Sequence, residues 1–183
     1  LKKRRKKRMV NDAEFKTDDL IIYGASGVCL VKDICVPDIN WIDTTKKYYK
    51  LEQVYNKGNI IYSPVDNSKT VMRKILSKEE TEELIMQIPS IKTFWVDDRK
   101  MREEECKKAL STYNCYELVR IIKTLYLGKE AQVRQKKAVS QVDTRYLNMA
   151  ADLLHGELAF PLEMPKEQVE GYIIEQVRRL ESE

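Results

Sequence analysis

Two large aromatic side chains, Phe94 and Trp95, stand in a short segment that also carries several cations. The basic residues of this segment are Lys92, Arg99, Lys100 and Arg102. An aromatic ring can wedge into a distorted base step of DNA while lysine and arginine hold the phosphates. An indole in a small helical domain can equally fill the groove between two helices. The residues alone leave both roles open for Trp95.

Further basic side chains occur later in the chain, and three of them suit the same purpose. Arg120 and Lys123 are three residues apart and therefore share one face of a helix, and Arg145 precedes an apolar position by one residue. These three side chains can therefore lie on one DNA-facing surface together with the cations of the aromatic segment. The candidate DNA-contacting residues are thus Trp95, Lys92, Arg99, Lys100, Arg102, Arg120, Lys123 and Arg145.

Signals for catalysis are nearly absent. His155 is the single histidine, and it has no companion at catalytic or metal-ligand spacing, so a structural role near a helix end is expected. No P-loop, G-x-G-x-x-G or G-x-S-x-G motif occurs. The four cysteines form no C-x-x-C pair, which predicts free thiols and neither zinc nor another cofactor: Cys29, Cys35, Cys106 and Cys115. We predict a protein that is not an enzyme.

Charge is unevenly spread along the 183 residues. The whole chain carries +4, but residues 1–14 hold seven basic and two acidic side chains, which leaves −1 for the remainder. A like-charged block such as LKKRRKKR repels itself, so residues 1–14 are predicted to be a disordered arm or a vector-derived remnant. The longest apolar stretches are far too short to span a bilayer, and no signal peptide is recognisable. We expect a cytoplasmic protein without a membrane partner.

Residues 15–72 have the pattern of short strands. A hairpin is predicted from 20–23 and 28–34 around Gly24-Ala25-Ser26-Gly27, and a second from 46–55 and 59–63, which Pro64 ends. About five strands of this length can close into a small barrel, although a sheet this small usually leaves one edge free for a partner.

The pattern changes to helices after a linker at 73–77. Ser77 and Glu80 form a capping box, Asp97 or Asp98 can begin a helix that runs to about Leu110, and Ser140 can cap another. Apolar stripes at helical spacing follow residue 118, and a last amphipathic helix is expected after Pro165. The fold class is therefore α+β, with a small β-barrel followed by an all-α helical bundle at 78–183.

These motifs, in this order, resemble the CarD family, also called CdnL. The resemblance is carried by FKTDDLIIYGASGV from Phe15, YYKL from Tyr48 and IIYSPVDN from Ile60, and in the helical half by LVR from Leu118 and LLHGELA from Leu153. The resemblance implies a Tudor-like β-domain that binds the β subunit of bacterial RNA polymerase. It also implies a helical domain that contacts promoter DNA at the upstream edge of the bubble, with Trp95 as the wedge that favours the open complex.

On this resemblance the polymerase-binding residues are expected on the second hairpin, at Tyr48, Ile60, Ile61 and Tyr62. A monomer that modulates the stability of the open complex is the expected form of the protein. An RNA- or ribosome-associated adaptor is the alternative, because small β-barrels with basic helical appendages also serve there.

Overall fold

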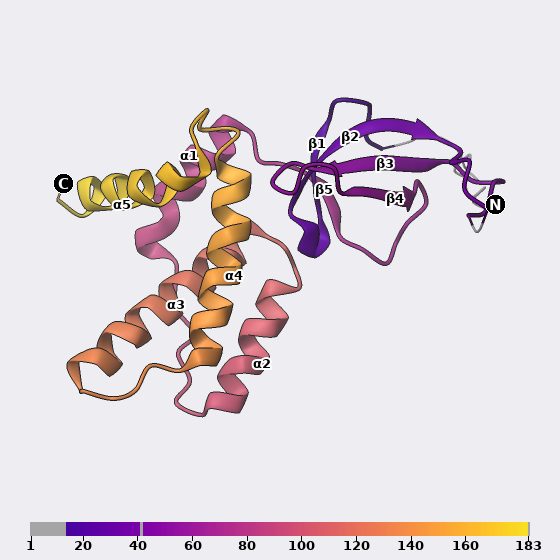
Figure 1. Cartoon of the computed structure of the whole chain (residues 1–183). Helices are drawn as coiled ribbons and strands as arrows, with labels where there is room; N and C mark the ends of the chain where they lie inside the picture. Colours follow the sequence, from indigo (N-terminus) through magenta and orange to yellow (C-terminus); the bar gives the residue numbers. More distant parts are fainter. Residues whose placement is uncertain (1–13, 41, 183) are drawn as a thin grey trace, which may run out of the picture.

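The structure, a computed structural model, describes residues 14–40 and 42–182. The predicted basic arm, Glu14 apart, lies outside the described residues. A β-sheet and a helical part follow one another along the chain and lie side by side, with the long helix α4 next to the sheet (Figure 1). The layout is α+β, as predicted.

Five strands form one antiparallel sheet in the order β4-β3-β2-β1-β5. Both predicted hairpins are confirmed, since β1 pairs Ile21 with Cys29 of β2, and β3 pairs Leu51 with Ile61 of β4. Gly24 and Gly27 adopt the positive φ angles, 47° and 66°, that the first connection requires. The strand bounds are β1 (Leu20–Tyr23), β2 (Val28–Cys35), β3 (Tyr48–Gln53), β4 (Ile60–Pro64) and β5 (Met72–Lys74).

The sheet has its own small core on one face. Alternate residues of β1, β2 and β3 form one cluster with Phe15, whose backbone N–H donates to Tyr49 Oη at 3.2 Å. The buried members are Phe15, Ile21, Cys29, Val31, Tyr49 and Leu51.

The predicted barrel does not close. Within the described residues the strands end in two separate edges, β4 and β5, which do not pair with each other. The strand β5 is only three residues long and pairs with β1 alone among the described strands. Arg73 and Lys74, which fall in the predicted linker, belong to this strand.

The helical part begins where the sequence indicates. The Ser77–Glu80 capping box is present in both directions, with the Ser77 hydroxyl accepting from Glu80 N and the Glu80 carboxylate accepting from Ser77 N. Asp98 and Ser140 cap the next predicted starts. The helices are α1 (Lys78–Gln87), α2 (Arg99–Leu110), α3 (Cys115–Arg134), α4 (Gln141–Leu158) and α5 (Lys166–Ser182), with a short 3-10 turn η2 (Ile88–Ser90) after α1.

A single core joins these helices, with Leu118, Ile121, Leu125, Leu154 and Leu158 at its centre. The helices α2, α3 and α4 pack on one another, while α5 extends sideways from the end of α4 and lies against α1 (Figure 1). In the part of the chain that the structure describes, no helix is long and apolar enough to cross a membrane.

Candidate nucleic-acid interface and protein-binding edge

The aromatic segment between η2 and α2 lies along α3. Phe94 N donates to Thr124 Oγ1 at 3.1 Å, and Lys123 Nζ donates to the carbonyls of Ile88, Pro89 and Ile91 at 2.7–2.9 Å. These bonds satisfy backbone groups that the ends of α1 and η2 would otherwise leave free. The segment is thus held in one extended course from α1 to α2.

Trp95 is fixed on three sides. Its benzo ring lies against Gly128 of α3, its Nε1 donates to Asp97 Oδ1 at 2.9 Å, and Arg102 Cζ lies 4.3 Å from the ring centroid. The side chain nevertheless remains 38% exposed. The indole therefore combines a helix-packing contact with an accessible surface, so both roles considered for it have a physical basis.

Arg102 is placed beneath Trp95 and away from solvent. It is 3% exposed, and its guanidinium donates to both carboxylate oxygens of Asp143 on α4, at 2.8–3.2 Å, and to the carbonyls of Val96 and Asp97. A guanidinium that is buried and has four of its five donors so engaged is not accessible to a phosphate. Arg102 thus orients the indole of Trp95 and the start of α2.

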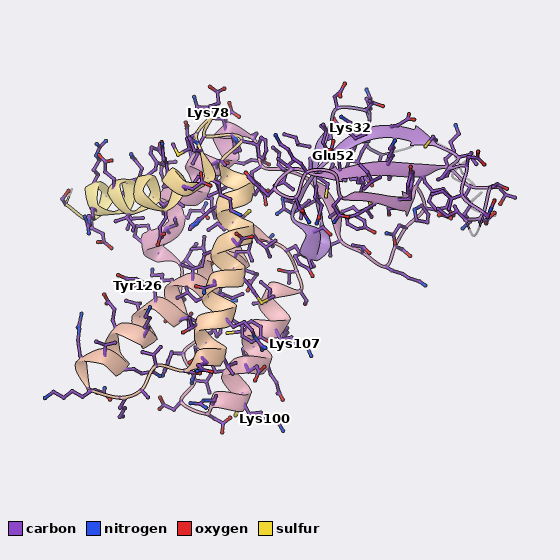
Figure 2. All side chains as sticks on the ribbon, in the orientation of Figure 1. Lys32, Glu52, Lys78, Lys100, Lys107 and Tyr126 are labelled. Carbon is purple, nitrogen blue, oxygen red and sulfur yellow. The ribbon has the colours of Figure 1, made fainter. Side chains whose placement is uncertain are left out.

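Three other predicted cations face solvent close to Trp95, namely Lys92, Arg99 and Lys100. Figure 2 shows Lys100 at the end of α2 that points away from the sheet, with Lys107 further along the same helix. Exposed lysine and arginine at a helix start can pair with phosphates without a desolvation cost. These three residues are therefore the predicted cations of this segment that remain accessible.

The remaining predicted cations are already engaged with protein groups. Arg120 pairs with Glu117 at 2.8 Å and lies over the ring of Phe94, and Arg145 pairs with Glu103 at 3.3 Å. Arg145 is well exposed and its pair is at the surface, where ion pairs are weak. The structure therefore brings Lys92, Arg120 and Lys123 together on the aromatic segment, and leaves Arg145 apart on α4.

The predicted polymerase-binding residues lie at the outer edge of the sheet. The strand β4 pairs only with β3 among the described strands, so one row of its backbone groups is free. Ile60 is 38% exposed and Tyr62 lies half-buried opposite Lys50, whereas Ile61 packs against the sheet core and Tyr48 is buried. Ile60 and Tyr62 are the accessible side chains of this edge.

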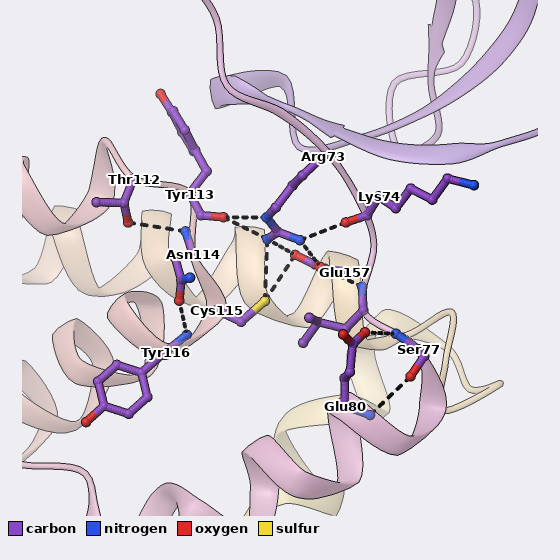
Figure 3. A network of polar contacts seen from close by, with 11 residues as sticks. Arg73, Lys74, Ser77, Glu80, Thr112, Tyr113, Asn114, Cys115, Tyr116 and Glu157 are labelled. Carbon is purple, nitrogen blue, oxygen red and sulfur yellow. Dashed lines mark hydrogen bonds and ion pairs between the residues drawn. The ribbon is translucent and has the colours of Figure 1, made fainter. Parts of the chain in front are cut away.

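A polar network joins the sheet to the helices, as Figure 3 shows. Arg73 of β5 donates to both oxygens of Glu157 on α4, at 2.5 and 2.7 Å, and to the carbonyl of Tyr113. Glu157 also accepts from Leu76 N at 3.0 Å and from Cys115 Sγ at 3.1 Å. Burial, and then the neighbouring Glu157 carboxylate, raise the pKa of the Cys115 thiol far above its usual value.

His155, which was predicted to be structural, lies in the last turn of α4 and is half-buried. Burial lowers its pKa, and the nearby Lys166 acts in the same direction. No group of three potential metal ligands is brought together among the described residues. All four cysteines are free.

Sequence reasoning missed four residues of these sites: Arg73, Gly128, Asp143 and Glu157. Gly128 interrupts a strong helical pattern, and a glycine inside a helix often marks a close packing contact, so it carried a usable signal. The two acids and Arg73 gave none, because their partners are 41 and 84 residues away in the chain.

A sheet with an open edge is typical of domains that bind other proteins, and exposed aromatic and basic side chains are typical of surfaces that meet nucleic acid. Residues 15–76 match the family described as CarD-like/TRCF RID domain. The resemblance seen in the sequence is confirmed for this part. The family is one of RNA polymerase-interacting transcription factors, and its domain is a non-catalytic interaction domain. No curated protein matches the chain.

Proposed function

We propose that this protein is a transcription regulator that binds the β subunit of bacterial RNA polymerase through the sheet and touches promoter DNA through the helical part. The observation that carries the proposal is the family match over residues 15–76, which covers every strand of the sheet and its open edge at β4. Since RNA polymerase acts in the cytoplasm, the protein works there as a monomer beside the enzyme.

The polymerase contact is assigned to β4. A partner strand that pairs with the free row of backbone groups supplies affinity, and the exposed side chains Ile60 and Tyr62 supply specificity. Lys50 and Tyr62 sit opposite one another on β3 and β4, so the contact surface includes both a cation and an aromatic ring.

The DNA contact is assigned to the exposed part of Trp95 with Lys92, Arg99 and Lys100. Gly128, Asp97 and Arg102 already restrict the indole, so little conformational entropy is lost when it meets a base step. A wedge that binds unstacked DNA better than duplex DNA shifts the promoter toward the open complex without any chemical step. The site of action is the upstream edge of the bubble.

Two matched variants test the proposal in promoter-melting and pull-down assays. Trp95→Ala should shorten the lifetime of the open complex while capture of the β subunit stays unchanged. Tyr62→Glu should abolish that capture, whereas Tyr126→Glu, on a tyrosine of α3 that is 53% exposed, should not. Unchanged melting kinetics in Trp95→Ala would remove the wedge, and β-subunit capture by Tyr62→Glu would remove the β4 interface. Co-purification with ribosomal proteins in place of polymerase subunits would favour an RNA-associated adaptor.

A further inference from the structure

Two of the contacts between the sheet and the helical part meet neighbouring residues of α4. From β5, Arg73 reaches Glu157. From the turn after β3, Tyr55 Oη donates to the carbonyl of Gly156 at 2.8 Å. The strands β3 and β5 are separated by β2 and β1 in the sheet, so the two residues reach α4 from different parts of the sheet.

The first contact is a buried ion pair with every acceptor position in use. Glu157 is 1% exposed, and each of its oxygens accepts one bond from Arg73 and one further bond, from Leu76 N or from the Cys115 thiol (Figure 3). Arg73 is itself fixed in the sheet, because β5 pairs it with Ile22. Its other donors reach the carbonyls of Tyr113 and Lys74. One guanidinium therefore joins β5, the turn between α2 and α3, and α4.

The second contact is packed as well as hydrogen-bonded. A Cβ placed on Gly156 would lie 3.1 Å from Tyr55 Cε2, so the phenol ring rests almost directly on the α4 backbone. Lys166 Nζ lies 4.6 Å from the centre of that ring, and Phe160 is a further aromatic neighbour. A rotation of the sheet about the connection at 75–77 would have to break both contacts together.

We propose that Arg73–Glu157 and Tyr55–Gly156 form an interdomain clamp that fixes the orientation of the sheet relative to α4. The functional part of this inference rests on the proposed function: with the clamp closed, the distance from the β4 edge to Trp95 is set, and the polymerase contact determines where the indole meets DNA. Arg73 and Glu157 are then positioning residues that touch neither partner.

Three buried thiols allow the clamp to be tested in the full chain. Cys115 lies in the clamp, Cys29 in the sheet core and Cys106 in the helical core. A thiol reagent followed by peptide mass analysis reports each region separately, because a buried cysteine reacts only when its surroundings open. Opening of the clamp exposes Cys115 alone, whereas unfolding exposes all three.

Arg73→Met removes one partner of a buried pair, and it should raise the labelling rate of Cys115 on the order of 100-fold while Cys29 and Cys106 stay protected. Tyr55→Phe leaves the surroundings of the thiol intact and removes only one hydrogen bond, and it should still raise the rate by roughly 2- to 10-fold. Lys74→Met is the matched control, since this neighbouring side chain is 62% exposed and pairs only with Asp19 at the surface. It should label as the native chain does.

The labelling and promoter-melting results test the clamp and the proposed function separately. Cys115 labelling that is unchanged in both Arg73→Met and Tyr55→Phe overturns the clamp. Faster labelling with an unchanged open-complex lifetime overturns the positioning role, provided that Trp95→Ala shortens this lifetime. Faster labelling together with a shortened lifetime, while the β subunit is still captured, supports both. An open-complex lifetime that is unchanged in Trp95→Ala removes the wedge from the proposed function, and the clamp is then judged by labelling alone.

Discussion

The benzo ring of Trp95 lies so close to Gly128 that a Cβ added to the glycine would stand 1.8 Å from Cζ3 of the indole. No side chain fits at position 128 unless the ring moves. The position of the aromatic candidate for DNA contact is thus determined by a glycine 33 residues further along the chain, in the middle of α3.

Gly128→Ala should displace the indole and weaken its effect on DNA. Overpacking of this kind costs about 1–3 kcal/mol, which exceeds the gain of about 0.5–1 kcal/mol that alanine brings to a helix. The chain has one other tryptophan, Trp41, so the emission of Trp95 is isolated in a Trp41→Phe background. In that background the Trp95 fluorescence of Gly128→Ala should shift to the red, and acrylamide should quench it more strongly.

Gly171→Ala is the control for that substitution. Gly171 also lies within a helix, α5, but nothing stands within 4 Å of a Cβ built there, so this change should stabilise the chain slightly and leave Trp95 emission unaltered. Identical spectra for Gly128→Ala and the native chain would show that the indole does not rest on the glycine.

Arg102→Met should destabilise the protein rather than remove a phosphate contact. Asp143 would be left buried without its partner, a loss that typically costs about 3–5 kcal/mol. Urea unfolding followed by circular dichroism measures this difference directly. Arg99→Met, at an exposed position of the same helix, should change the free energy of unfolding by less than about 0.5 kcal/mol.

Salt dependence should distinguish cations that contact DNA from those that hold the fold. Lys100→Ala should reduce the slope of log binding constant against log salt by about 1, because one phosphate contact is lost. Lys123→Ala should leave this slope unchanged and lower stability, since its ammonium is bonded to three carbonyls. Equal slopes for Lys100→Ala and the native chain would exclude Lys100 from the interface.

Stability should fall as the pH is lowered from 7 toward 5. Burial, with Lys166 acting in the same direction, lowers the pKa of folded His155 below its ordinary value of 6.5, whereas Glu170 and Asp152 oppose the shift. Between the lowered pKa and 6.5 the unfolded chain binds more protons than the folded chain, so acid favours unfolding in that window. His155 is the single histidine, and urea midpoints for His155→Gln should depend less on pH across this range. A parallel pH dependence in both proteins would assign the effect to other groups.

The sequence predicted local structure well and long-range partners poorly. The hairpin around Gly24 and Gly27 and the caps at Ser77, Asp98 and Ser140 depend on neighbours within a few residues, and all of these were confirmed. Closure of the sheet depends on whether β4 meets β5, which no local pattern encodes, and the barrel prediction was wrong.

In the candidate sites, too, the sequence indicated local features and gave no signal for distant partners. Arg99 and Lys100 are exposed at the start of a helix and Lys92 in the segment before it, whereas the burial of Arg102 follows from Asp143 on a distant helix. A charged residue in a sequence gives the same signal in both cases. Only the tertiary partner distinguishes an arginine that faces solvent from one that is held inside the fold.

The Arg73–Glu157 pair also makes the two halves unequal as evolutionary modules. If the sheet is transplanted into another protein, it carries away an arginine that is already about a quarter exposed and that water can hydrate. The helical half would retain a glutamate with 1% exposure and no cation to neutralise it. Separation of the two halves should therefore destabilise the helical half more than the sheet.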